Sequence, residues 1–141
     1  MEFKEFKKYY IIRVDKGEEV VQTLKQFCSA QGIRLGKVTG IGAVNKATIG
    51  LFDTATKQYH SVELKGDHEI TSLMGNISTM NGEVYLHLHA NISDTKYNTY
   101  GGHLNAAVVS ATAEIMIEAI DGEVDRAFSH EIGLNLYKFN K

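Results

Sequence analysis

Residues 69–92 read EITSLMGNISTMNGEVYLHLHANI, and the dipeptide Asn81-Gly82 divides them into two runs that favour strands. Asn-Gly is a strong signal for a two-residue hairpin turn, because both residues tolerate the positive φ that such a turn requires. We therefore predict an antiparallel hairpin with strands Glu69–Ser78 and Glu83–Ile92. Alternate side chains of a strand share a face, so the second strand has an apolar face of Val84, Leu86, Leu88, Ala90 and Ile92 and an opposite face of Tyr85, His87, His89 and Asn91.

The histidines of this strand form the most informative chemical pattern in the sequence. His87 and His89 project to the same side, about 6.5–7 Å apart along the strand. Their imidazoles can converge on one metal ion, each with a bond of about 2.0–2.1 Å. A third histidine, His103, follows Gly101-Gly102, where glycine permits unusual dihedrals and close backbone approach. The polar segment 93–100 can fold His103 back onto the strand, which predicts a three-histidine site.

Three neutral imidazoles favour zinc, with cobalt, nickel and iron as alternatives. Three protein ligands would leave a fourth position for water or a small anion. Glu114 could support the site as the carboxylate partner of a histidine N–H, or it could simply be exposed. A His-x-His pair on a strand is also typical of solvated or hydrogen-bonded side chains, so the residues leave both interpretations open. The remaining histidines, His60, His68 and His130, lack this geometry.

The rest of the sequence predicts one helix and further strands. Apolar residues at Val20, Val21, Leu24, Phe27 and Cys28 follow a helical period, which predicts a helix over about residues 18–31 that ends at Gly32. Alternating or β-branched runs predict further strands, namely Tyr9–Val14, Leu35–Val44, Ala47–Phe52, Gln58–Leu64, Thr112–Ile120 and Gly133–Phe139. The segment Leu104–Ser110 fits either a strand or a short helix. Gly36, Gly40 and Gly42 predict bulges or close backbone approach.

Composition limits the class of protein. A chain of 141 residues, 43% hydrophobic and 23% charged, fits one soluble domain over residues 1–141. Cys28 is the one cysteine, which excludes an intrachain disulfide and a cysteine-based zinc site; we expect it to be an inert core thiol. The net charge of -2 argues against a generally basic nucleic-acid surface, although it leaves a local patch open. With no long apolar run and no signal segment at Met1–Glu5, we expect a cytoplasmic protein without a transmembrane helix.

Five short stretches, in order along the chain, carry a family resemblance: Val38–Ala43, Gly66–Asn76, His87–Ala90, Gly101–Leu104 and Ala111–Glu114. The sequence resembles the plants-and-prokaryotes-conserved (PPC) domain, in particular its stand-alone prokaryotic members. The resemblance implies an α/β fold (α+β type) with a mainly antiparallel sheet and flanking helices, assembled as a homotrimer. It also implies a metal site at His87, His89 and His103. In plant members the equivalent of Gly66, Asp67, His68, Glu69, Ile70 and Thr71 is associated with partner proteins, but Asp67 and His68 differ from the plant pattern.

Three functions are consistent with these residues. The first is a homotrimeric protein that binds a divalent metal, zinc above all, at the three histidines, with room for a small anionic ligand. The second is a metal-dependent hydrolase or lyase acting on a small polar substrate. The third is a DNA-associated regulatory protein, which would have to bind without an AT-hook because the sequence contains no proline and so no Arg-Gly-Arg-Pro core.

Overall fold

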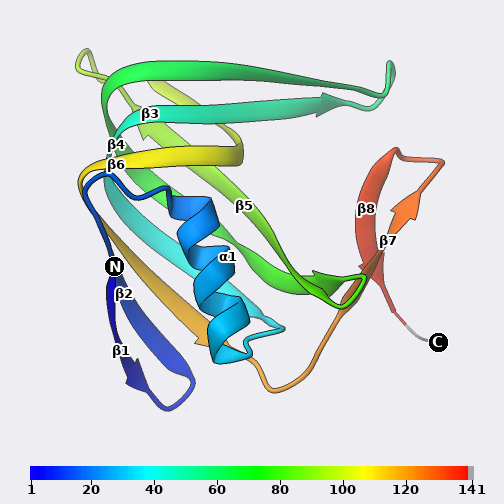
Figure 1. The fold of residues 1–141 in the computed structure, drawn as a ribbon. Helices are drawn as coiled ribbons and strands as arrows, with labels where there is room; N and C mark the ends of the chain where they lie inside the picture. Colours follow the sequence, from blue (N-terminus) through cyan, green and yellow to red (C-terminus); the bar gives the residue numbers. More distant parts are fainter. Residues whose placement is uncertain (140–141) are drawn as a thin grey trace.

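The computed structural model describes residues 1–139, and strands dominate it (Figure 1). Within these residues one helix and eight strands occur, in the order β1 (Glu2–Phe6), β2 (Tyr9–Asp15), α1 (Val20–Gln31), β3 (Gly36–Asp53), β4 (Gln58–Met80), β5 (Glu83–Ser93), β6 (Thr99–Ala119), β7 (Asp125–Ser129) and β8 (Leu134–Lys138). The class is therefore strand-rich, and the single helix corrects our expectation of flanking helices.

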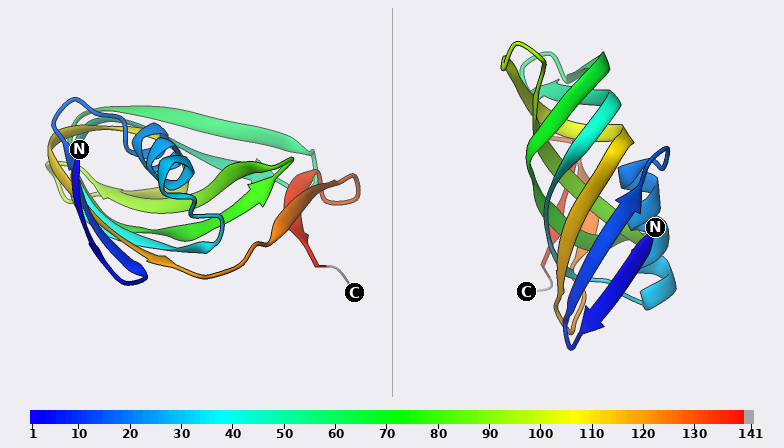
Figure 2. Two further views of the ribbon diagram at one scale, coloured as in Figure 1. Left: turned by 60° about the horizontal axis from the view of Figure 1, so that its bottom comes forward. Right: turned by 90° about the vertical axis from the view of Figure 1, so that its left-hand side faces the viewer.

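The strands form one sheet in which the central members pair in a closed circuit. The order is β1-β2-β6-β3-β4-β7-β8, and β5 pairs with both β4 and β6. The sheet therefore curves strongly on itself, as both views of Figure 2 show. All pairings are antiparallel except the contact of β4 with β7, which is a parallel pair at Thr79 and Asp125. The sheet is therefore mixed, although it is mainly antiparallel as predicted.

The helix α1 packs against β5 and β6 on the concave side of the sheet (Figure 1). It begins at Val20 because the side chain of Glu19 accepts hydrogen bonds from the backbone N–H groups of Val21 and Gln22. It ends at Gly32, which adopts the left-handed conformation with φ 68°, where glycine has no steric penalty. The predicted helix over residues 18–31 is confirmed, with a start two residues later. None of the helical structure in residues 1–139 is long and apolar enough to cross a membrane.

The predicted hairpin forms as β4 and β5. Met80 pairs with Glu83, and the intervening Asn81 and Gly82 have φ 53° and 81°, as a two-residue hairpin turn requires. Other predictions need correction, because segments that we separated are continuous: Leu35–Val44 and Ala47–Phe52 both belong to β3, and Gln58–Leu64 and Glu69–Ser78 both belong to β4. Leu104–Ser110 lies within β6 as a strand, and the sequence pattern missed β1 and β7.

The glycines of β3 allow its neighbours to approach closely. A Cβ atom at Gly42 would lie 2.7 Å from Ala113 Cα, and one at Gly40 would lie 2.9 Å from the carbonyl oxygen of Glu114. The register with β4 shifts between Gly40 and Gly42, and the register with β6 shifts between Gly42 and Val44. These shifts are β-bulges, which bend a strand, so the predicted bulges and close approach are confirmed.

The core lies between α1 and the concave face of the sheet. The helix contributes Val20, Leu24, Phe27 and Cys28, all of which are buried. Burial raises the pKa of the Cys28 thiol to about 12, so it stays protonated at neutral pH and has little nucleophilic character. This agrees with the inert core thiol expected from its place on the apolar stripe.

Candidate metal centre

Strand register brings the three histidines together. In the pairing of β5 with β6, His89 lies directly opposite His103, and directly opposed residues of an antiparallel pair project to the same face. His87 lies two residues before His89 and therefore shares that face. The turn that sets this register is held by Asp94, whose Oδ1 accepts hydrogen bonds from the backbone N–H groups of Lys96 and Asn98. The polar segment 93–100 thus folds His103 back onto β5, as predicted.

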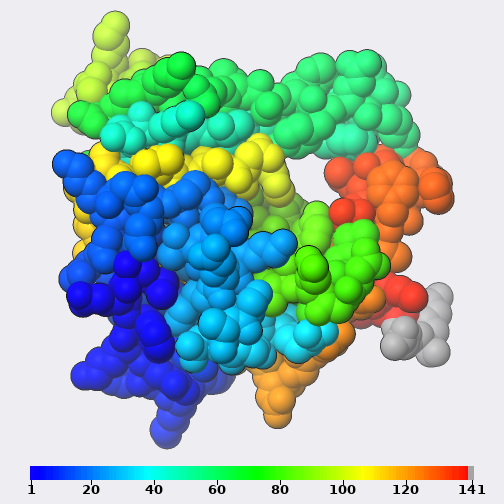
Figure 3. Space-filling view, viewed as in Figure 1, coloured from blue at the N-terminus to red at the C-terminus, as the bar shows by residue number. Residues whose placement is uncertain are grey.

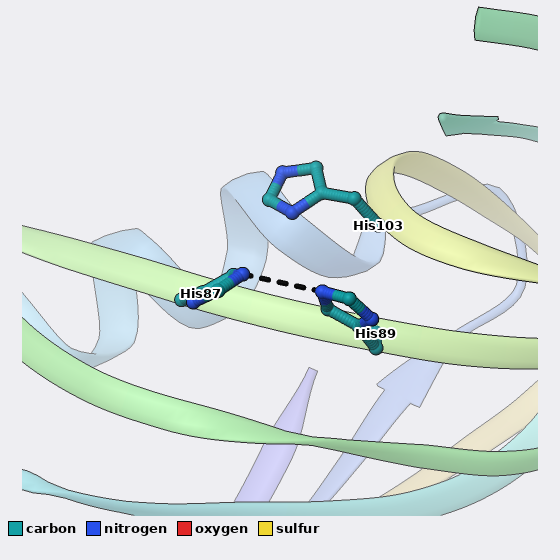
Figure 4. A group of neighbouring side chains, drawn as sticks. All are labelled: His87, His89 and His103. Carbon is teal, nitrogen blue, oxygen red and sulfur yellow. Dashed lines mark hydrogen bonds between the residues drawn. The ribbon is translucent and has the colours of Figure 1, made fainter. Parts of the chain in front are cut away.

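The imidazoles converge on a single point (Figure 4). One ring nitrogen from each of His87, His89 and His103 lies within 4.8 Å of the other two. The Nε2 atoms of His87 and His89 are 3.2 Å apart, and the ring centroids of the three residues are 5.1 to 5.7 Å apart. His89 is exposed, whereas His87 and His103 are half-buried.

This arrangement fits a tetrahedral metal ion. Two nitrogens bound to one zinc ion at about 2.0–2.1 Å are separated by about 3.3 Å in tetrahedral geometry, close to the 3.2 Å between His87 and His89. The third nitrogen lies no more than 4.8 Å from these two, so a small rotation of the His103 side chain would complete the set. Within residues 1–139, this is the one cluster of three or more His, Cys, Asp or Glu side chains with such spacing.

The surroundings of His87 and His103 keep these two imidazoles in the neutral form that binds metals. Burial, the neighbouring imidazoles of His103 and His89, and the Arg126 guanidinium lower the pKa of His87 to about 4. Burial and the His89 imidazole lower the pKa of His103. Because a metal ion needs the lone pair that protonation removes, both residues are available as ligands at neutral pH.

The histidines line a cleft of about 710 Å³ between strands β3 to β6 and the β7–β8 hairpin of the same sheet. Figure 3 shows the molecule hollowed between the far ends of β3 and β4, the start of β6, and β7–β8. Its other walls are mostly aromatic, apolar or amide side chains, and no Asp or Glu is among them: Leu51, Phe52, Tyr59, Asn76, Tyr85, Asn105, Arg126, Leu134, Asn135, Leu136 and Tyr137. The cleft is of the size that small-molecule sites usually have.

The close approach predicted at Gly101-Gly102 positions His103. A Cβ atom at Gly102 would lie 2.6 Å from the backbone oxygen of Gly50 on β3, so glycine lets β6 lie tightly against β3 beside His103. Neither Gly101 nor Gly102 has a positive φ, so the unusual dihedrals that we expected do not occur. The ring of Tyr59 meets His103 edge-on, with centroids 6.2 Å apart.

The other predicted residues lie elsewhere. Glu114 is exposed in the second half of β6 and lines a different cleft, together with Ile11 and Met74, so the structure does not bring it to the histidines. His68 is buried, and its Nδ1 lies 2.6 Å from the Gly66 oxygen. The remaining histidines, His60 and His130, are exposed and outside the cluster.

The segment suggested as a partner-binding stretch lies in the middle of β4. Its side chains alternate, with His68 and Ile70 buried and Asp67, Glu69 and Thr71 exposed. This is the period of a strand with one face on the core. The exposed positions of the segment are therefore acidic or polar.

Sequence reasoning missed Arg126, which lies in the wall of the cleft. Its guanidinium donates hydrogen bonds to Ser78 Oγ at 2.7 Å, to Asn76 Oδ1 at 2.9 Å and to the backbone oxygen of Asn135 at 2.9 Å. The rings of Tyr85 and Tyr137 lie 4.8 and 4.3 Å from its central carbon. No local motif marks this arginine, because its partners come from β4, β5 and β8.

Comparisons with known proteins agree with this architecture. A candidate DNA-binding protein from Bacteroides thetaiotaomicron has a TM-score of 0.96 at 35% identity, over 98% of this chain and 96% of that one. A metal-containing protein from Archaeoglobus fulgidus has a TM-score of 0.88 at 34% identity, over 99% of both chains. A curated relative, the bifunctional protein GlmU of a Synechococcus species, is 30% identical over 112 residues, and the chain spans only 16% of that longer protein's length.

The family assignment rests on a match over most of the sequence. A sequence profile of the Plants and Prokaryotes Conserved (PCC) domain matches residues 1–121, which include β1 to β6 and all three histidines. The β7–β8 hairpin lies beyond the matched residues. Because the profile covers far more than half of the 141 residues, the protein belongs to the Plants and Prokaryotes Conserved domain family, the family that the five sequence stretches resembled.

Proposed function

We propose that this protein binds a divalent metal ion, zinc in the first place, through His87, His89 and His103. The observation that carries the proposal is the convergence of three ring nitrogens within 4.8 Å of one another. The lowered pKa values of His87 and His103 support it, because they keep two ligands unprotonated. The name of the Archaeoglobus fulgidus neighbour, a metal-containing protein, agrees with it.

The chemistry at such an ion would follow from its ligands. Three imidazoles carry no charge, so they leave the full charge of the ion in place, together with a position for water or a small anion. The cleft residues would hold and orient whatever occupies that position. A hydrolase or lyase reaction would further need a group that moves protons, and the cleft lining described within residues 1–139 includes no carboxylate to act as a general base. We therefore propose ligand binding ahead of catalysis.

Metal content tests the proposal directly. Protein purified without added metal, or exposed to zinc and then desalted, is expected to carry about one ion per three-histidine site, as measured by elemental analysis. A wild-type protein that retains none of zinc, cobalt or nickel after such exposure would overturn the proposal.

A DNA-associated role is the second candidate, favoured by the description of the Bacteroides thetaiotaomicron neighbour as a candidate DNA-binding protein. With a net charge of -2, binding would have to use a local basic patch. Metal-free protein that binds duplex DNA with an affinity falling steeply as salt rises, through release of counterions, would support this role in place of the metal site.

We also propose that the protein assembles as a homotrimer, as its family resemblance implies. The outer face of the sheet supports assembly, because Ile11, Ile41, Met74 and Met116 are exposed there by 42%, 57%, 55% and 47% around one shallow groove. Apolar patches of this kind on a soluble protein usually mark interaction surfaces. Light scattering is expected to give three times the chain mass of 15.7 kDa; a mass of one chain at all concentrations would contradict the assembly.

A further inference from the structure

Among residues 1–139, the buried guanidinium of Arg126 has no anionic partner. Its residue is 6% exposed, and no carboxylate within residues 1–139 lies at ion-pair distance from it. Its hydrogen-bond acceptors, Ser78, Asn76 and the Asn135 backbone, are all neutral. A buried charge without a counter-charge costs folding free energy. An anion bound beside Arg126 at the wall of the cleft would offset that cost.

The guanidinium also has hydrogen-bonding capacity to spare. Arginine offers five N–H groups in a planar fork, and Arg126 donates three hydrogen bonds, one from Nε and one from each terminal nitrogen. One N–H on each terminal nitrogen therefore has no acceptor among residues 1–139. Two such groups are suited to the paired oxygens of a carboxylate or phosphate. The flanking rings of Tyr85 and Tyr137 hold the plane of the fork in place.

The arginine and the histidines face the same space. Asn76, which accepts a hydrogen bond from Arg126, pairs directly with His87 in the register of β4 with β5. Arg126 and all three histidines line the cleft of about 710 Å³, and the described part of the chain adds no acidic residue to its lining. The Arg126 charge is near enough to contribute to the lowered pKa of His87. A divalent ion at the histidines would add to the positive charge of this space without any neutralising side chain.

We propose that Arg126 and the three-histidine centre together bind the acidic group of a small organic anion. This proposal rests on the proposed metal site and names the ligand class for it. The shared chemistry is an oxyanion, either a carboxylate or a phosphate ester, that accepts from the two remaining N–H groups of Arg126 and reaches the open position of the metal. The apolar walls formed by Leu51, Phe52, Leu134 and Leu136 would contact the organic body, which favours an organic acid over inorganic phosphate.

The test uses cobalt-loaded wild-type protein, because the visible spectrum of cobalt(II) reports on its open position. Benzoate, phenyl phosphate, inorganic phosphate and the neutral isostere benzamide are titrated in parallel, followed by absorption and by calorimetry. We expect one or both organic anions to bind at least about tenfold more tightly than benzamide, the difference that charge-assisted hydrogen bonds provide. The comparison of benzoate with phenyl phosphate identifies which oxyanion is preferred, and tighter binding of inorganic phosphate than of both would overturn the proposal of an organic body.

Variants then assign the effect to the arginine. Arg126→Met is expected to weaken binding of the preferred anion at least about tenfold while the cobalt content stays unchanged. Arg34→Met is the matched control, because Arg34 is only partly buried, pairs with Glu123 and does not line the cleft. The Arg34→Met protein should bind the anion as the wild type does. Arg126→Lys keeps the charge but loses the fork, and is expected to fall between the wild type and Arg126→Met.

The outcomes separate this inference from the proposed metal site. If the wild type binds no cobalt, the metal proposal fails, and the shared site fails with it. If it binds cobalt but does not distinguish benzoate and phenyl phosphate from benzamide, only the anion proposal fails. Should Arg126→Met unfold, because Arg126 also connects β7 to β4 and β8, Arg126→Lys decides the question. Weaker anion binding by Arg126→Lys at unchanged cobalt content supports the shared site, and wild-type affinity contradicts it. The contrast between charged and neutral ligands does not assign the effect to the arginine, because the metal charge also favours anions.

Discussion

The His103→Ala protein is expected to bind zinc at least about 100-fold more weakly than the wild type, because even residues that only support a metal ligand contribute about 10–100-fold to affinity. His103 is the one ligand that β6 provides, and its loss leaves His87 and His89, whose Nε2 atoms lie 3.2 Å apart on a single strand. An open zinc site uses three protein ligands, and the two remaining imidazoles are one too few. Competition with a chromophoric chelator measures the affinity of both proteins.

The matched control is His60→Ala, which removes an exposed histidine on β4 outside the cluster. The His60→Ala protein is expected to retain the zinc affinity of the wild type. The control therefore distinguishes the loss of any histidine from the loss of a ligand at the site. Thermal unfolding gives a second readout, because a ligand at about 100 times its dissociation constant stabilises the folded state by about 2.7 kcal/mol. Zinc should raise the midpoint for the wild type and His60→Ala but not for His103→Ala. Equal affinities in all three proteins would mean that zinc binds elsewhere.

The local sequence pattern predicts only the part of the site that lies on one strand. The alternation of β5 places His87 and His89 on one face, and this follows from the sequence alone. The place of His103 depends on the register of β5 with β6, which the polar turn at Asp94 fixes. The composition of this turn predicted that the chain reverses, but it did not predict a particular register. Arg126 could not be predicted, since β7 meets β4 through a parallel pair at Thr79 and Asp125, far apart in sequence.

Bulges explain why the fold was predicted in fragments. Within β6, Leu104 pairs with Ile49 and Ala106 pairs with Thr48, so Asn105 has no partner in the ladder. The extra residue resets the two-residue period, and the buried positions Leu104 and Ala107 fall three apart. A spacing of three is also what a helix produces, which is why Leu104–Ser110 fitted both structures. In β3, the register shift between Val44 and Lys46 falls between the two predicted fragments Leu35–Val44 and Ala47–Phe52 and divides the pattern in the same way.

The Leu24→Ala protein is expected to lose about 2–5 kcal/mol of folding free energy, the usual range for a fully buried leucine, because the surrounding side chains fill only part of the cavity that remains. Leu24 has no exposed surface and lies on α1, the one helix described in residues 1–139, which packs against β5 and β6. Chemical denaturation of metal-free protein measures the loss without a contribution from zinc, and equal chain concentrations keep the effect of assembly comparable between the two proteins.

Gln26→Ala is the control for helix propensity, because Gln26 is exposed on the same helix and its replacement should change stability by less than about 0.5 kcal/mol. The apolar face of β5, with Val84 and Leu88 buried, points to the core, whereas alternation directs His87 to the opposite side. Leu24→Ala should therefore weaken the fold while the folded protein still takes up zinc at the wild-type ratio. A loss of zinc from fully folded Leu24→Ala protein would show that the helix determines the geometry of the histidines, and a loss of stability no larger than that of Gln26→Ala would show that α1 contributes little to the core.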